Sequence, residues 1–195
     1  MLFPRFLLLI LWLLICVRID VMLDEKMMIE RIIHLSGLYF TPDEIKHLEV
    51  TDFGLNDFKH KGLTIHTYVN TSRCCAKELI LLPYQLCPEH EHPTIGTILG
   101  KEETFRCRFG KISVFVQGEP TLNPSVDLPE DKENYTVFHE VVLTPGDQFT
   151  LTPNSKHWFK AHDEGAVVSE FSTHSNDDTD IFTNKSIQRS HFLNV

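Results

Sequence analysis

The stretch that decides the fold of this chain contains Pro88-Glu89-His90-Glu91-His92-Pro93 and Gly100-Lys101-Glu102-Glu103-Thr104-Phe105. Successive side chains of a strand point to opposite faces, so His90 and His92 share one face if this stretch is extended. Glu103 follows on what we predict to be the next strand, and His157 adds a third imidazole at a later turn. Such a set of ligands is typical of a divalent metal ion that keeps positions open for a substrate.

We therefore predict a metal site built from His90, His92, Glu103 and His157. A histidine pair alone is more often a surface or core pair, but the neighbouring carboxylate and the third imidazole favour a metal. The absence of cysteine from this set argues against a closed structural zinc site. Manganese, iron, cobalt, nickel and zinc all suit three nitrogens and one oxygen, and affinity order alone does not choose among them.

The sequence around the predicted site is rich in short apolar and β-branched runs that begin at Leu63 and are separated by Pro, Gly, Asn and Asp. Many short strands without intervening helices indicate an antiparallel sandwich or barrel. The strands that we predict are Leu63–Val69, Ala76–Leu82, Thr104–Phe109, Lys111–Val116, Tyr135–Leu143, Gln148–Leu151, His157–Ala161 and Ala166–Ser172.

The residues before Leu63 have a helical pattern. Leu23–Ser36 is amphipathic and precedes Gly37, a natural helix stop. A second, short helix is predicted to begin after Thr41 and to run to about Glu49, because Thr41-Pro42-Asp43-Glu44 has the residues of a capping box. We expect a leader over residues 1–21, a helical extension over residues 22–62, and one barrel over residues 63–195 that ends in a polar tail.

The composition sets limits on partners and compartment. The 195 residues carry a net charge of −9 without a basic patch, so we expect no nucleic-acid partner. The five cysteines have no CxxC spacing, and reduced, structural thiols are the default interpretation.

The leader contains the apolar run Phe6–Val17, with Arg5 before it and Arg18 after it. The run is too short to span a bilayer comfortably, although it has the length of a signal-peptide core. No small-residue cleavage site follows it, so we expect a cytoplasmic protein. Secretion or anchoring through residues 3–17 is the alternative, and membrane association is expected only if the leader is retained.

The motifs resemble those of the cupin superfamily. The first cupin motif is matched by His90, His92, Glu103 and Gly110, and the second by Gly146, Pro153 and His157. A narrower resemblance, to the D-lyxose isomerase family, covers about residues 27–189. Its most distinctive strings here are Gly100-Lys101-Glu102-Glu103-Thr104-Phe105 and Ser169-Glu170-Phe171-Ser172.

This resemblance implies a mainly β cupin fold, a double-stranded β-helix or jelly-roll barrel, with a short N-terminal helical segment. It implies a homodimer that binds Mn²⁺ through His90, His92, Glu103 and His157. The implied activity is aldose–ketose isomerisation of a small sugar, D-lyxose with D-xylulose and, as a second pair, D-mannose with D-fructose, through a cis-enediol(ate).

Glu170 and Lys101 are the candidate catalytic residues. A carboxylate in the apolar strand around Glu170 needs a partner or a role, and we interpret it as the general base rather than an outward-facing residue. Lys101 lies two residues before Glu103 and is interpreted as stabilising an enediolate, with a solvated loop lysine as the alternative. Asp180 and Lys77 are further candidates for substrate contacts. The alternatives are a solvated turn around Asp180 and a sheet-edge lysine at position 77.

Two other classes of function stay open from the residues alone. A cupin site that holds iron can activate dioxygen, which makes a metal-dependent oxygenase one alternative. The other is a non-catalytic cupin that binds sugar without converting it. A metal-assisted hydride shift also competes with proton transfer by Glu170 as the route of isomerisation.

Overall fold

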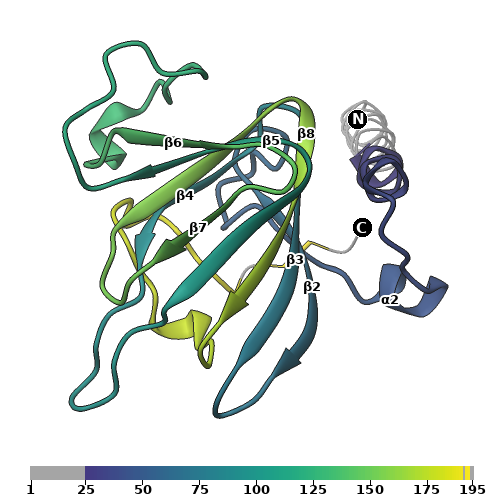
Figure 1. Ribbon diagram of the computed structural model, residues 1–195, viewed down its shortest axis with the longest axis horizontal. Helices are drawn as coiled ribbons and strands as arrows, with labels where there is room; N and C mark the ends of the chain where they lie inside the picture. Colours follow the sequence, from purple (N-terminus) through teal and green to yellow (C-terminus); the bar gives the residue numbers. More distant parts are fainter. Residues whose placement is uncertain (1–24, 191, 194–195) are drawn as a thin grey trace, which may run out of the picture.

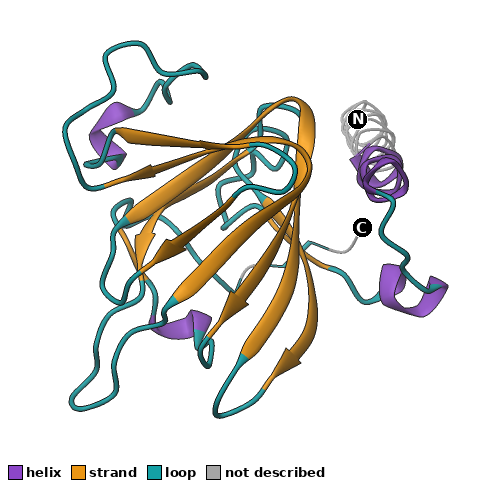
Figure 2. Cartoon of the chain, in the orientation of Figure 1, coloured by secondary structure: helices purple, strands orange, loops and turns teal. Residues whose placement is uncertain are grey.

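The computed structural model describes residues 25–190 and 192–193 of the chain. A helix over residues 25–36 and the short helix α2 (Pro42–Lys46) precede a set of antiparallel strands (Figures 1 and 2). The strands are β1 (Glu49–Thr51), β2 (Leu63–Asn70), β3 (Cys75–Leu81), β4 (Leu86–Glu91), β5 (Glu103–Val116), β6 (His139–Leu143), β7 (Gln148–Leu151), β8 (His157–Ser172) and β9 (Ile181–Phe182). The prediction of a mainly β fold with a short N-terminal helical segment is confirmed.

The two longest strands, β5 and β8, organise the sheet. They pair with each other along their whole length, from Glu103 opposite Ser172 to Val116 opposite His157. The last part of β8 also pairs with β3, which continues to β2 and β1, whereas the first part of β8 pairs with β4 and then β9. The two ends of the β5–β8 pair thus belong to different parts of one curled sheet (Figure 1).

Four of the predicted strands are wrong in one respect, because each long strand was predicted as two. Gly110 was expected to separate two strands and instead lies inside β5, and Gly165 lies in the same way inside β8. Both glycines have positive φ angles, +68° and +77°, and a Cβ built on Gly110 would lie 2.0 Å from the carbonyl oxygen of Gly165. Here glycine allows two strands to bend side by side rather than to end.

Apolar side chains fill the inside of the curled sheet, and a second cluster lies on its outer face. Inside, Phe105, Phe159 and Val168 belong to the largest cluster. Outside, the N-terminal helix packs Ile32 and Ile33 in one cluster with Ile80. Burial of this helix face explains why an amphipathic pattern precedes the barrel.

The N-terminal predictions hold only partly. Thr41 caps α2 in the predicted capping box with Glu44, but the helix ends at Lys46 rather than near Glu49. The predicted leader over residues 1–21 lies outside the described residues. Within the described part of the chain, no helix has the length and apolarity that a membrane span requires.

Candidate active site

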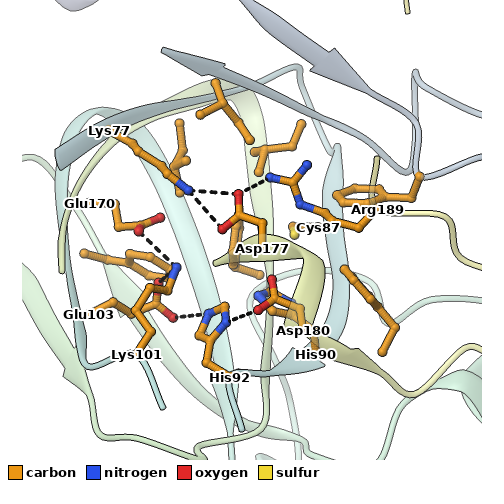
Figure 3. A pocket seen from close by; sticks show the side chains of 17 residues that line it. Lys77, Cys87, His90, His92, Lys101, Glu103, Glu170, Asp177, Asp180 and Arg189 are labelled. Atoms are coloured by element: carbon orange, nitrogen blue, oxygen red, sulfur yellow. Dashed lines mark hydrogen bonds and ion pairs between the residues drawn. The ribbon is translucent and has the colours of Figure 1, made fainter. Parts of the chain in front are cut away.

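A pocket inside the curled sheet is lined by all of the predicted site residues except His157 (Figure 3). Its charged lining consists of four carboxylates and three cationic side chains: Glu103, Glu170, Asp177, Asp180, Lys77, Lys101 and Arg189. Apolar residues such as Phe105, Phe159 and Phe182 form the rest of the wall. A concave site with a few convergent polar groups on an apolar wall is typical of small-molecule binding.

Three histidines meet beside this pocket, and two of them, His90 and His92, line it. His90 lies on β4, His92 follows the end of that strand, and His157 is the first residue of β8, paired with His90. All three are buried, and one ring nitrogen of each lies within 4.8 Å of those of the other two. The strand alternation predicted for His90 and His92 is confirmed, because both line the pocket.

The hydrogen bonds of the rings fit a metal. The Nδ1 atoms of His90 and His157 lie 2.8 and 3.0 Å from the carbonyl oxygens of Pro88 and Ser155. A carbonyl only accepts, so each Nδ1 donates, and an imidazole in this tautomer has the lone pair of Nε2 for a ligand. The Nε2 atom of His157 is buried, and its one polar neighbour among the described residues, Glu103 Oε1 at 3.1 Å, does not form a hydrogen bond of good geometry with it. Metal-binding histidines are oriented in this way, so the triad suits a divalent cation.

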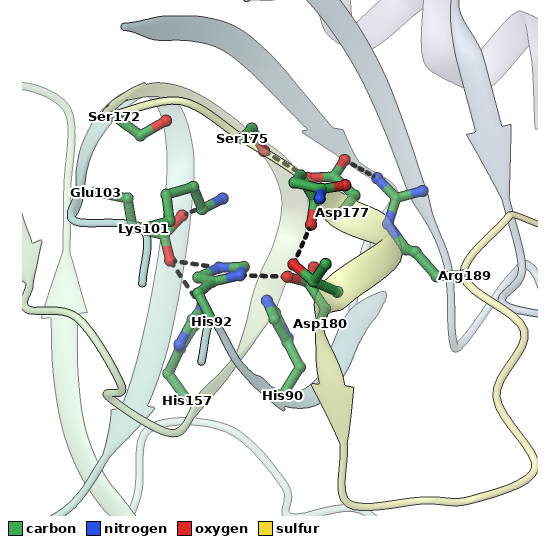
Figure 4. A network of polar contacts seen from close by, with 12 residues as sticks. His90, His92, Lys101, Glu103, His157, Ser172, Ser175, Asp177, Asp180 and Arg189 are labelled. Carbon is green, nitrogen blue, oxygen red and sulfur yellow. Dashed lines mark hydrogen bonds and ion pairs between the residues drawn. The ribbon is translucent and has the colours of Figure 1, made fainter. Parts of the chain in front are cut away.

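A series of charged groups leads from the histidines through Glu103 to Lys101 (Figure 4) and from Lys101 to Glu170 (Figure 3). Glu103 Oε1 lies 3.1 Å from Nε2 of both His92 and His157, and Glu103 Oε2 lies 2.8 Å from Lys101 Nζ. Lys101 Nζ also donates to Glu170 Oε1 at 3.0 Å. The predicted ligand Glu103 and the two predicted catalytic residues therefore lie together, all buried.

Burial and neighbouring charges shift the pKa values of these groups in different directions. Burial and the neighbouring imidazoles lower the pKa of His90 well below its usual value. Burial also acts to lower the pKa of His92, but the Glu103 carboxylate and the Asp180 hydrogen bond outweigh it, and the pKa rises to about 9. Burial opposes the charge of Lys101, yet Glu103 and Glu170 raise its pKa well above the usual range. Lys101 therefore stays an ammonium between two carboxylates.

Burial tends to raise the pKa of Glu103, but Lys101 and His92 outweigh it and hold the pKa well below its usual value. The carboxylate is therefore ionised, the form in which it can bind a cation.

The structure places Asp180 and Lys77 differently from the interpretations that treated them as surface residues. The side chain of Asp180 is 6% exposed and accepts a hydrogen bond from Nδ1 of His92 at 2.5 Å, so the solvated turn is wrong for this side chain. Lys77 lies on β3, between β2 and β8, and is 5% exposed, so the sheet-edge interpretation is also wrong. Its Nζ donates to Ser175 Oγ and to both carboxylate oxygens of Asp177. Both residues line the pocket.

Sequence reasoning missed Asp177 and Arg189. Asp177 lies in a run of polar residues that was interpreted as a turn, and Arg189 lies in the predicted polar tail. In the structure, Arg189 pairs with Asp177 at 2.6 Å, and both face the pocket. The one local signal was Ile181-Phe182, the apolar pair that forms β9 against His90 and Glu91 and brings the tail to the site.

Comparison with solved structures identifies the fold. The match to the L-ribose isomerase of Cellulomonas parahominis covers 87% of this chain and 93% of that chain. The TM-score is 0.66 and the sequence identity is 18%. The L-ribose isomerase of Acinetobacter sp. DL28, in complex with L-ribose, has a TM-score of 0.65 and 18% identity, with coverage of 81% of this chain and 89% of that chain. These similarities confirm the expected cupin-type fold.

Sequence comparison identifies the family. A D-lyxose ketol-isomerase of Thermofilum sp. is 52% identical over 160 residues, which are 82% of this chain and 89% of that protein. A D-lyxose/D-mannose isomerase of Thermosediminibacter oceani is 53% identical over 155 residues, 79% of this chain and 86% of that protein. The sequence model of the D-lyxose isomerase family matches residues 43–194. The chain belongs to the D-lyxose isomerase family.

Proposed function

We propose that this protein is a metal-dependent aldose–ketose isomerase that interconverts D-lyxose and D-xylulose, with D-mannose and D-fructose as a second pair. The observation that carries the proposal is a buried histidine triad that Glu103 connects to the Lys101–Glu170 ion pair, beside a pocket that His90, His92 and this ion pair line. An ion site next to a candidate base is what proton transfer between adjacent carbons of a sugar requires. The relatives named above, which are about half identical to this chain, support the choice of sugar.

His90, His92 and His157 would hold the ion, with Glu103 as the fourth ligand. The low pKa of Glu103 supports this role, because a ligand carboxylate must be ionised. When bound, a divalent ion polarises the sugar carbonyl and makes the neighbouring C–H bond more acidic. We propose Mn²⁺ as this ion because the family resemblance implies it.

Glu170 would carry the proton between C1 and C2 through a cis-enediol(ate). Its Oε1 atom receives hydrogen bonds from Lys101 and from the hydroxyl of Ser172, at 3.0 and 3.1 Å, which fix the carboxylate against the pocket. Lys101 would stabilise the negative charge that develops on the sugar oxygens. Farther along the pocket wall, Asp177 and Lys77 present groups that can bind the remaining hydroxyls.

One assay tests the function. The full-length protein is dialysed against EDTA and offered D-lyxose, D-mannose and D-xylulose with and without added Mn²⁺, and the products are separated by chromatography. We expect ketose from each aldose, and D-lyxose from D-xylulose, with added Mn²⁺ only. In the His92→Ala variant, metal and activity should be lost together, and full metal occupancy in that variant would remove His92 from the ligand set.

The same reaction run in deuterated water separates the two routes of isomerisation. Transfer by Glu170 exchanges the proton with solvent, so the product should carry deuterium, whereas a hydride shift leaves it unlabelled. Oxygen uptake during turnover would instead favour the cupin oxygenase, and sugar binding without conversion would favour the non-catalytic cupin.

We further propose that the protein is a cytoplasmic homodimer. The family resemblance supports the dimer, and light scattering on a size-exclusion column tests it by a mass of twice 22.6 kDa. The free thiols of Cys75, Cys87 and Cys107, packed inside the protein, support a reducing compartment. Fractionation of cells that express the full chain tests the location.

A further inference from the structure

A buried carboxylate behind the metal-ligand strand is not used by the proposed reaction. Glu89 is 1% exposed and lies on β4 next to His90. Its Oε2 atom accepts from the main-chain N–H groups of Thr136 and Val137 at 2.6 and 3.0 Å. Its Oε1 atom accepts from the hydroxyls of Thr136 and Thr183 at 2.7 and 2.5 Å. The carboxylate thus joins β4 to the segment before β6 and to the residue after β9.

Glu89 lies within a β-bulge that sets the direction of the histidines. Cys87 pairs with Phe159 of β8 and His90 pairs with His157, so three steps along β4 match two steps along β8. Strict alternation would put Cys87 and His90 on opposite faces, yet both line the pocket. The extra residue re-aims the strand, as β-bulges near active sites do. Without the bulge, His90 and His92 would face away from the ion site.

The main chain of Val137 links Glu89 to the other side of the triad. Its N–H group donates to Glu89, and its carbonyl oxygen accepts from Nε1 of Trp158 at 2.8 Å. Trp158 is fully buried, stacks on Phe115 with ring centroids 3.9 Å apart, and directly follows His157. One residue therefore connects the sequence neighbours of two metal-ligand histidines.

We propose that Glu89, together with Val137 and Trp158, is a positioning unit that fixes the bulge of β4 and thereby the spacing of the three histidine rings. Glu89 acts through His90 and His92 and touches neither ion nor sugar. The proposal rests on the metal site assigned under the proposed function. Groups that orient metal ligands typically change metal affinity by about 10–100-fold when they are removed.

Two substitutions of Glu89 distinguish a role in positioning the histidines from a general role in packing. Glu89→Ala leaves two main-chain N–H groups without their acceptor and frees the bulge. In Glu89→Gln, the amide oxygen can accept from both N–H groups, while the two threonine hydroxyls turn to accept from the amide nitrogen. We therefore expect Glu89→Gln to rescue what Glu89→Ala loses. Glu91→Ala, on the same strand and beside both histidines, is the matched control.

The quantity to measure is the Kd for Mn²⁺ in the absence of sugar. Mn²⁺ is titrated into EDTA-dialysed, full-length protein, and the electron paramagnetic resonance signal reports the free Mn²⁺. Glu89→Ala should raise the Kd by about tenfold or more, and Glu89→Gln and Glu91→Ala should stay within about threefold of wild type. A folded Glu89→Ala variant, by circular dichroism, with wild-type Kd would overturn the proposal.

If Glu89→Ala does not fold, Trp158→Phe provides the second test. It keeps an aromatic ring near Phe115, removes the N–H group that binds Val137 and also removes part of the buried ring volume. A rise of the Mn²⁺ Kd by about threefold or more supports the positioning unit, and an unchanged Kd overturns it. Failure of the wild-type protein to bind Mn²⁺ would overturn the proposed metal site as well, which separates the two results.

Discussion

Glu170 and Glu103 both contact the ammonium group of Lys101, at 3.0 and 2.8 Å, but have different proposed roles. Glu103 also contacts two imidazoles, whereas Glu170 receives only Lys101 and Ser172 as hydrogen-bond donors among the described residues. The ammonium group of Lys101 therefore lies between Glu103, the proposed metal ligand, and Glu170, the proposed base. At the scale of single residues, this separation can be tested by substitutions that remove one property at a time.

Glu170→Gln should lower kcat by about 10²–10⁴-fold, because an amide keeps the shape of the side chain but cannot take up the proton. The Mn²⁺ content should stay at the wild-type level, since Glu170 is not among the proposed ligands. Steady-state kinetics and elemental analysis measure the two quantities. Glu102→Gln removes an exposed carboxylate from the same region and serves as the control. Turnover near the wild-type rate in Glu170→Gln would remove this residue from the mechanism.

Asp180→Asn should weaken Mn²⁺ binding by about tenfold, because a neutral amide holds Nδ1 of His92 less firmly than a carboxylate does. With saturating Mn²⁺, the KM for sugar should remain close to that of wild type. Titration with Mn²⁺ and kinetics at saturating metal give these two values, with exposed Asp178→Asn as the control. A raised KM with an unchanged metal Kd would instead support the substrate contact expected from the sequence.

The proximity of His90, His92 and Glu103 could be predicted because their signals are local: an alternating pair and a nearby carboxylate. His157, much later in the chain, has no such local signal, and its place in the set came from the turn at Pro153 and from the family resemblance. Asp177 and Arg189 could not be predicted in this way. Asp177 contacts Lys77, which is 100 residues away in the chain, and Arg189 pairs with Asp177, so no local pattern encodes these contacts. Such residues look like solvated turn and tail residues until the sheet has closed.

At the scale of secondary-structure elements, the bend shared by β5 and β8 is the decisive feature. A straight strand from His157 to Glu170 would span about 43 Å, yet both residues lie within one contact of the Lys101–Glu103 pair. The strand positions could be predicted from β-branched and apolar runs, but their continuity could not. A glycine in such a pattern is equally consistent with the end of a strand and with a bend inside it, and only the pairing with a partner strand distinguishes the two.

Gly110→Ala should destabilise the protein by about 2 kcal/mol or more. Alanine is strained at a φ of +68°, and its Cβ would lie 2.0 Å from the carbonyl oxygen of Gly165, so the paired backbone must move. Gly37→Ala is the matched control, because φ there is +70° and a Cβ meets nothing within 4 Å. It should cost only about 1 kcal/mol. Urea unfolding gives the free energy of unfolding of both variants. Equal losses in this free energy would show that the close approach of the two strands does not contribute to the effect of Gly110→Ala.

At the scale of the whole molecule, Asp177 ties the C-terminal segment to the barrel. Its carboxylate accepts from Lys77 on β3 and pairs with Arg189, so it joins parts of the chain that are remote in sequence. Burial acts to raise the pKa of Asp177, but Lys77 and Arg189 outweigh it and hold the pKa well below the ordinary value. A carboxyl whose pKa falls on folding stabilises the protein above its unfolded pKa and ceases to do so in acid.

Asp177→Asn should therefore lower the free energy of unfolding by about 2 kcal/mol near pH 7. The difference from wild type should shrink as the pH falls below about 4, the pKa of an aspartic acid in an unfolded chain. Urea titrations of metal-free protein at a series of pH values give the difference directly, and Asp178→Asn controls for loss of an exposed charge. A difference that stays constant down to pH 3 would contradict the role of this ion pair.

The bend of β5 and β8 has a consequence for how the range of accepted sugars can change. Main-chain hydrogen bonds along one pair of strands fix the distance from the ion to the base, so substitutions cannot retune it without unfolding the barrel. The segment from Asp177 to Arg189 is held to the same pocket by side-chain contacts, one two-residue strand and isolated main-chain hydrogen bonds from Thr183 and Gln188. Laboratory evolution toward a new aldose should accordingly collect its useful mutations in this C-terminal wall, and leave the two long strands untouched.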